Sequence, residues 1–119
     1  MPHITIEHST ELVNKWEIAA LFDAIERAYS DSPIISPQNV KMRAISYDHY
    51  RVAGGFTPFA HISIAMMAGP SETAKHALAD KIFNAACEVL APVQHVTLDI
   101  RDMVPVTYRK RASDWSAAL

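Results

Sequence analysis

The spacing of apolar residues constrains the fold of this chain more than any other feature, because it switches between a strand period and a helix period in a fixed order. Period-two alternation predicts four strands, over residues 1–8, 40–52, 59–67 and 95–103. The last has the cleanest pattern, with Val96, Leu98 and Ile100 alternating with polar side chains. Helical spacing separates the first strand from the second and the third from the fourth. The chain therefore reads twice as strand, helix, strand.

The first predicted helix has a clear start and stop. Ser9 or Thr10 is a candidate N-cap, and Glu11 in the first turn suits the positive end of the helix dipole. Residues 30–33 contain a proline and polar side chains that end the helix. One apolar stripe predicts its buried face: Leu12, Trp16, Ile18, Leu21, Phe22, Ile25, Ala28 and Tyr29.

The second predicted helix begins after Ser71, its expected N-cap, and is ended by Pro92. Its buried side is expected to carry Ala74, Leu78, Ile82, Ala85, Ala86, Val89 and Leu90. Cys87 lies in this helix and is interpreted as a small buried residue.

Two strand–helix–strand units predict an α+β fold with a four-stranded mixed sheet and two helices on one face. We expect residues 1–119 to form a single domain with 104–119 as a C-terminal tail that contacts a neighbouring subunit. Residues 104–108 could form a short edge strand there. The chain has no spare element to cover the second face of the sheet. Apolar residues on both faces, such as Met42 and Ile45, suggest that another subunit covers it.

Composition narrows the class of protein. The net charge of −2 gives no general attraction to nucleic acid or an anionic membrane, and the Arg109–Arg111 run is interpreted as a solvated tail. No apolar run is long enough for a membrane span, and the N-terminus lacks the pattern of a signal peptide. The single cysteine fits a reducing compartment. A cytoplasmic protein is the expectation.

Pro2 is the residue with the most distinctive chemistry. If Met1 is removed, Pro2 becomes a secondary amine held by the first strand, with its φ angle fixed by the ring. Such an amine can act as a general base when its pKa is brought towards neutrality. The alternative is that Pro2 only marks the start of the chain.

Lys41 and Arg43 lie on one face of the second predicted strand, two residues apart. They are either a solvated strand face or a pair of carboxylate-binding groups. Two cations near an amine also lower its pKa, because they disfavour its protonated form. Adjacent first and second strands would bring Pro2, Lys41 and Arg43 together at one sheet end.

Other chemistries find little support. The six histidines lack the spacing of a metal site, so no metal is expected, and His3 and His61 are interpreted as hydrogen-bonding residues of the sheet. Gly54-Gly55 lacks the spacing of a nucleotide-binding loop, and no cofactor is predicted.

The opening Pro2-His3-Ile4-Thr5-Ile6-Glu7-His8-Ser9 and the repeated layout resemble the tautomerase superfamily. The closest resemblance is to the 5-carboxymethyl-2-hydroxymuconate isomerase family, with further matches at Leu21-Phe22, at Arg43, in the third strand with its histidine, and at Ile82-Phe83. The resemblance reaches to about Asp102. It implies a cofactor-independent homotrimer with active sites near subunit boundaries, isomerising unsaturated 2-hydroxy or 2-oxo dicarboxylic acids.

By position, the resemblance implies that Pro2 is the general base and that Arg43 is one arginine of the family's substrate-binding pair. Lys41 stands at the other position of the pair, and Pro70 stands where the family has a further arginine. The alternative function is a non-catalytic ferredoxin-like small-molecule-binding or assembly module. In that case Pro2 is incidental, Lys41 and Arg43 are surface charges, and retention of Met1 would leave Pro2 as an amide.

Overall fold

The computed structural model describes residues 2–10, 15–55 and 57–111. In chain order its main elements are β1 (His3–Ser9), α1 (Lys15–Tyr29), β2 (Lys41–Tyr47), β3 (Phe59–Met67), α2 (Glu72–Val89) and β4 (His95–Met103). Two short 3-10 helices, η2 (Pro37–Asn39) and η3 (Pro105–Thr107), precede β2 and follow β4. The predicted bounds of β3 and β4 are confirmed.

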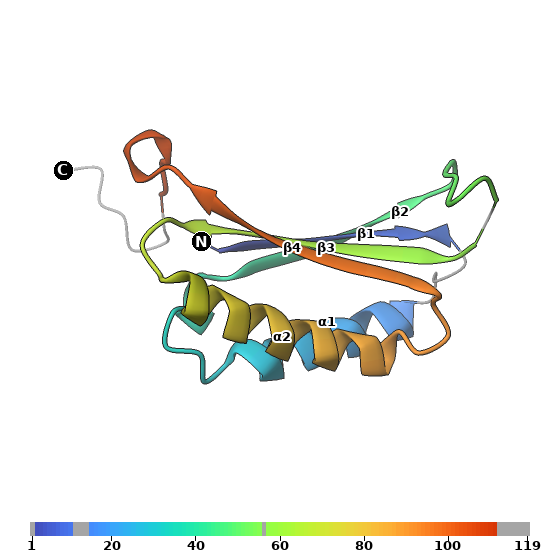
Figure 1. Cartoon of the computed structure of the whole chain (residues 1–119), viewed down its shortest axis with the longest axis horizontal. Helices are drawn as coiled ribbons and strands as arrows, with labels where there is room; N and C mark the ends of the chain where they lie inside the picture. Colours follow the sequence, from blue (N-terminus) through green and yellow to red (C-terminus); the bar gives the residue numbers. More distant parts are fainter. Residues whose placement is uncertain (1, 11–14, 56, 112–119) are drawn as a thin grey trace.

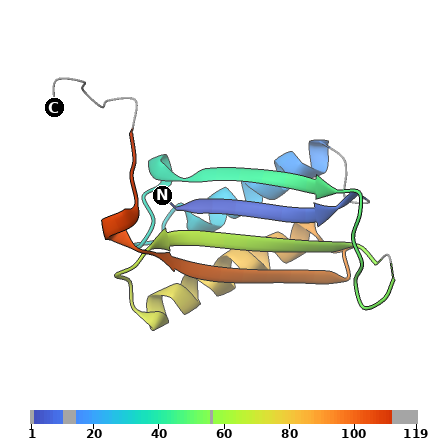
Figure 2. The ribbon, with the colours of Figure 1, turned by 90° about the horizontal axis from the view of Figure 1, so that it is seen from above.

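The four strands form one mixed sheet in the order β2-β1-β3-β4. β1 is parallel to β2, β3 is parallel to β4, and the two pairs meet antiparallel between β1 and β3. Both α-helices pack on the same face of the sheet (Figures 1 and 2). The predicted α+β architecture is confirmed.

The hydrophobic core lies between the sheet and the two helices. Even-numbered residues of β1 and β3 point into it, and Ile4, Ile6, Ile62 and Ile64 are fully buried. The helices contribute Leu21, Ile25, Leu78 and Ile82. Each fully buried side chain of this size contributes about 1.5–3 kcal/mol by removal from water. The alternation therefore fixes which sheet face the helices cover.

Helix α2 begins as expected. The Ser71 side chain accepts a hydrogen bond from the backbone N–H of Ala74 at 3.1 Å, and Glu72 lies in the first turn. At the first helix, by contrast, Ser9 belongs to β1, and its hydroxyl accepts a hydrogen bond from the Phe59 N–H at 3.1 Å. The predicted turn around Glu11 and Leu12 lies outside the described residues.

The second predicted strand was too long. β2 ends at Tyr47, and beyond it Val52 forms only an isolated bridge with Gly55. Ala53 and Gly54 between them have positive φ angles of 49° and 82°, which turn the chain back on itself. Residues 48–51, between the end of β2 and this bridge, form a bend and irregular backbone instead of strand.

The predicted edge strand at 104–108 is also wrong for the conformation of this chain, because Pro105–Thr107 forms a 3-10 turn. The Tyr108 N–H bonds back to the Pro105 carbonyl at 3.3 Å, so only Val104 and Tyr108, on either side of the turn, keep extended backbone angles. Within the described ranges, neither α-helix has the length and apolar character needed to cross a membrane.

Candidate active site

Pro2 is buried immediately before β1, and its carbonyl accepts a hydrogen bond from the Lys41 N–H at 3.1 Å. It lines a hollow of about 250 Å³ at one end of the core. The hollow is shared with the loop before β2, the end of β3 and the residues before α2: Ile34, Ser36, Asn39, Met66, Met67, Ala68 and Pro70.

No charged side chain is among the described residues that line this hollow. Pro70, at the position where the resemblance places a family arginine, is one of its walls. Gly69 before it has a φ of 143°, a conformation that side-chain-bearing residues rarely adopt. This turn takes the chain from β3 into α2 and carries Pro70 to the hollow.

Lys41 and Arg43 reach the same end of the sheet as Pro2 but lie on its other side. The register pairs His3 with Lys41 and Thr5 with Arg43. Both cations are exposed on the face opposite the helices, and neither lines the Pro2 hollow. The structure therefore brings the three predicted residues together along the backbone, while one subunit alone does not place them in one cavity.

His3 joins Arg43 to the C-terminal segment. Arg43 Nη1 donates a hydrogen bond to His3 Nδ1 at 3.0 Å, and His3 Nε2 lies 2.9 Å from the Tyr108 hydroxyl. The His3 and Tyr108 rings also meet edge to face, with centroids 5.9 Å apart. Sequence reasoning placed His3 in the sheet but missed Tyr108, since no local pattern links residues 105 positions apart.

The surroundings of His3 keep its imidazole neutral. Burial lowers the pKa of His3 most, and the positive charges of the N-terminus, Arg43 and Lys41 lower it further. Its ring therefore acts at neutral pH as an acceptor on one nitrogen and a donor on the other.

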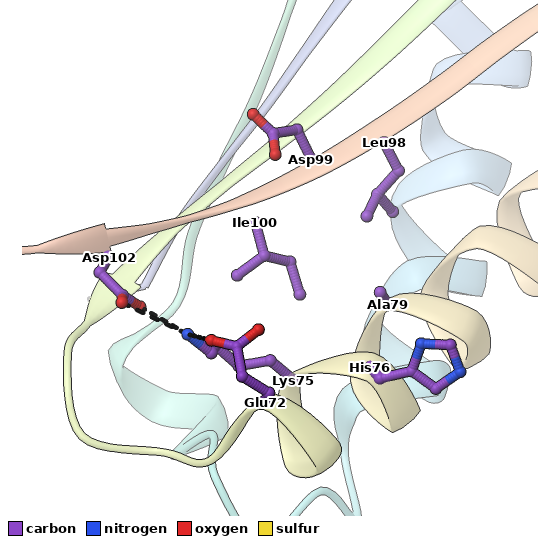
Figure 3. Close-up of a pocket in the computed structure, with 8 residues that line it drawn as sticks. All are labelled: Glu72, Lys75, His76, Ala79, Leu98, Asp99, Ile100 and Asp102. Carbon is purple, nitrogen blue, oxygen red and sulfur yellow. Dashed lines mark hydrogen bonds and ion pairs between the residues drawn. The ribbon is translucent and has the colours of Figure 1, made fainter.

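A second and larger hollow of about 460 Å³ lies between α2 and β4 (Figure 3). Its cation, Lys75, is already paired with Asp102 at 3.2 Å and with Glu72 at 3.1 Å, and these two carboxylates raise the pKa of Lys75. This hollow contains none of the residues predicted to be functional. We interpret its charges as a link that ties the start of α2 to β4.

Neither His61 nor Cys87 lines the Pro2 hollow. His61 Nδ1 lies 2.6 Å from Thr97 Oγ1, in keeping with a hydrogen-bonding role in the sheet. Cys87 is half-buried rather than fully buried, and burial raises the pKa of its thiol. Across residues 2–10, 15–55 and 57–111, histidine, cysteine and acidic side chains form no group of three that could hold a metal ion.

Solved structures share this fold across nearly the whole chain. A 5-carboxymethyl-2-hydroxymuconate delta-isomerase is 21% identical with a TM-score of 0.80, over 94% of this chain and 88% of that one. A 5-carboxymethyl-2-hydroxymuconate isomerase from Deinococcus radiodurans R1 is 19% identical with a TM-score of 0.80, and the match covers 92% of this chain and 88% of that one. A fused 4-OT wild type symmetric trimer is 22% identical with a TM-score of 0.79, and the match covers 98% of this chain and 97% of that one.

No curated protein sequence matches the chain significantly. The family model of 5-carboxymethyl-2-hydroxymuconate isomerase, however, matches residues 2–111, from the candidate base Pro2 to beyond Tyr108. This match includes every predicted site residue. The chain therefore belongs to the 5-carboxymethyl-2-hydroxymuconate isomerase family, and its class of activity is that of an isomerase.

Proposed function

We propose that this protein moves a proton along an unsaturated 2-hydroxy or 2-oxo dicarboxylic acid such as 5-carboxymethyl-2-hydroxymuconate, with the amine of Pro2 as the general base. The observation that carries this proposal is the position of Pro2, buried at the start of a central strand and lining a hollow whose described walls carry no charged side chain. Membership of an isomerase family supports the same reaction class.

The proposed reaction needs no cofactor. After removal of Met1, the neutral amine takes a proton from one end of the conjugated system, and the double bonds shift. The ammonium then returns the proton to a carbon at the other end, so the product is an isomer and the base is restored. Burial in uncharged surroundings favours the neutral form of an amine, which is the form that accepts a proton.

Lys41 and Arg43 are the proposed carboxylate-binding groups. Arg43 offers a planar fork of donors and Lys41 a point charge, so the pair suits a dianionic substrate. Because these cations and the Pro2 hollow lie on different sides of one subunit, we propose that a homotrimer completes the site at its subunit boundaries. The uncovered sheet face, with Ile45 half-exposed, supports assembly, as does the trimeric state named for one structural neighbour.

We also propose a cytoplasmic location, because a half-buried free cysteine suits a reducing compartment.

The C-terminal residues beyond 104 are proposed to contribute to the subunit boundary, in addition to the contacts that Tyr108 makes within its own chain.

The first test is the intact mass of the purified protein together with a ketonisation assay on 2-hydroxymuconate-type acids. We expect a mass without Met1 and measurable proton transfer. Retained Met1 in an active protein would refute the proline base, since Pro2 would then be an amide.

Pro2→Ala should abolish the activity, because a primary amine of different basicity and shape replaces the ring nitrogen. Arg43→Ala should mainly raise KM for dicarboxylates, by about tenfold or more for a lost charge-assisted hydrogen bond. A Pro2→Ala enzyme with the full rate would remove Pro2 from the mechanism, and unchanged kinetics in Arg43→Ala would remove Arg43 from the site.

A further inference from the structure

The hydrogen bond between Arg43 and His3 determines how the imidazole is protonated. A guanidinium group only donates hydrogen bonds, so His3 Nδ1, 3.0 Å from Arg43 Nη1, is the acceptor. A neutral imidazole then carries its proton on Nε2. That nitrogen donates to the Tyr108 hydroxyl at 2.9 Å. The chain of contacts therefore runs from Tyr108 through the His3 ring to Arg43.

Tyr108 reaches His3 because the C-terminal segment turns back across the end of the sheet (Figure 2). The 3-10 turn at Pro105–Thr107 redirects the chain after β4. Contacts from Tyr108 and Lys110 then attach the segment to its own subunit. Tyr108 packs its ring edge to face with His3 at an interplanar angle of 69°, and Lys110 Nζ donates to Asn39 Oδ1 at 3.0 Å. The second contact lies in the loop before β2, beside the Pro2 hollow.

We propose that His3 is the positioning residue for Arg43, and that Tyr108 holds the His3 ring in the tautomer and orientation that this role requires. The inference rests on the proposed function, in which Arg43 binds a substrate carboxylate. An exposed arginine loses considerable rotamer freedom when it binds an anion. A bond from one of its five N–H groups to His3 restricts the side chain beforehand and leaves the others for the carboxylate.

This arrangement has a distinctive dependence on pH. Protonation of His3 places a second N–H on Nδ1, facing the Arg43 guanidinium, and the hydrogen bond is lost. Besides the N-terminal amine, which the proposed mechanism keeps neutral, the charged groups around His3 are Arg43 and Lys41 on β2, and Tyr108 packs against it from the C-terminal segment. On the β3 side its register partner is Ala65, which does not titrate. Burial and these cations lower the pKa of His3 from its ordinary value, so positioning is complete at neutral pH and is lost as the pH falls through that lowered pKa.

Four variants separate positioning from a general effect on the fold. His3→Leu removes both ring nitrogens, whereas His3→Asn retains an acceptor oxygen close to the place of Nδ1. Tyr108→Phe removes only the hydroxyl oxygen from the contact at 2.9 Å. His61→Leu is the matched control, because His61 lies on the same sheet face and bonds to Thr97 instead of Arg43.

The readouts are KM and kcat on the dicarboxylate substrate and the Kd of adipate, an unreactive dicarboxylate, by calorimetry. We expect His3→Leu to raise KM and Kd about three- to tenfold with little change in kcat, because one hydrogen bond is lost. His3→Asn should restore both to within about twofold, and Tyr108→Phe should fall between wild type and His3→Leu. His61→Leu should bind adipate like wild type.

The pH profile adds an independent result. The Kd of adipate should rise more for wild type than for His3→Asn as pH falls through the pKa of His3, because in His3→Asn only the protonation of adipate itself weakens binding. The positioning role would be overturned if His3→Leu bound adipate with the same Kd as wild type. It would also be overturned if His3→Asn bound adipate as weakly as His3→Leu does. If His3→Leu fails to fold by circular dichroism, Tyr108→Phe and the His3→Asn pH profile decide.

Failure of the proposed function would look different. Arg43→Ala with an unchanged adipate Kd, or a wild-type protein that neither turns over nor binds dicarboxylates, would refute carboxylate binding by Arg43. The positioning role alone fails when Arg43→Ala weakens binding and His3→Leu does not.

Discussion

Ile6 provides a quantitative test of the fold that presents the site. It lies in the middle of β1, the strand that begins next to Pro2, and none of its surface is exposed. Its register partners are Ala44 on β2 and Ile62 on β3. Truncating Ile6 therefore removes contacts from the centre of the core without touching the proposed site.

The expected cost follows from the atoms removed. Ile6→Ala deletes three carbons, each worth about 0.8 kcal/mol of transfer free energy, and the residual cavity raises the total loss to about 3–4 kcal/mol. For a chain of 119 residues, this corresponds to a fall in Tm of roughly 12–16 °C. Ile6→Val deletes one carbon and should cost about 1 kcal/mol.

Urea unfolding at a fixed protein concentration measures both variants, since assembly makes stability depend on concentration. Asn84→Ala on the exposed side of α2 is the control and should remain within about 0.5 kcal/mol of wild type. An Ile6→Ala loss below about 1.5 kcal/mol, or equal losses in the Ala and Val variants, would show that Ile6 does not fill a close-packed core.

Three further predictions test separate features. Ser71→Ala should lower the free energy of unfolding by about 1 kcal/mol, because the cap on the Ala74 N–H is lost, and Ser71→Asp should retain most of it in urea titrations. Cys87 should react with a thiol reagent at pH 8 more slowly than an exposed cysteine, since burial raises the pKa of its thiol; equal rates in native and urea-unfolded protein would contradict this. Ile45→Lys should shift the proposed trimer towards smaller species in sedimentation velocity, because it places a charge on the half-exposed apolar position of the uncovered face, and an unchanged trimer would exclude Ile45 from the boundary.

The sequence determined the parts of the fold that depend on local pattern. The alternation of Val96, Leu98 and Ile100 with polar residues identified β4, because successive strand residues point to opposite faces. Ser71 was identifiable as an N-cap because its role depends on a backbone N–H three residues away. The candidate residues Pro2, Lys41 and Arg43 came from side-chain chemistry and from the family resemblance.

Only the tertiary structure decided which distant residues meet. It ended β2 at Tyr47 and turned residues 105–107 into a 3-10 helix, where short-range propensity allowed longer strands. It also placed Pro70 in the Pro2 hollow and Tyr108 on His3. Such contacts depend on sheet order, register and the path of a returning segment. Those are set by packing across the whole chain, and so no local window of sequence contains them.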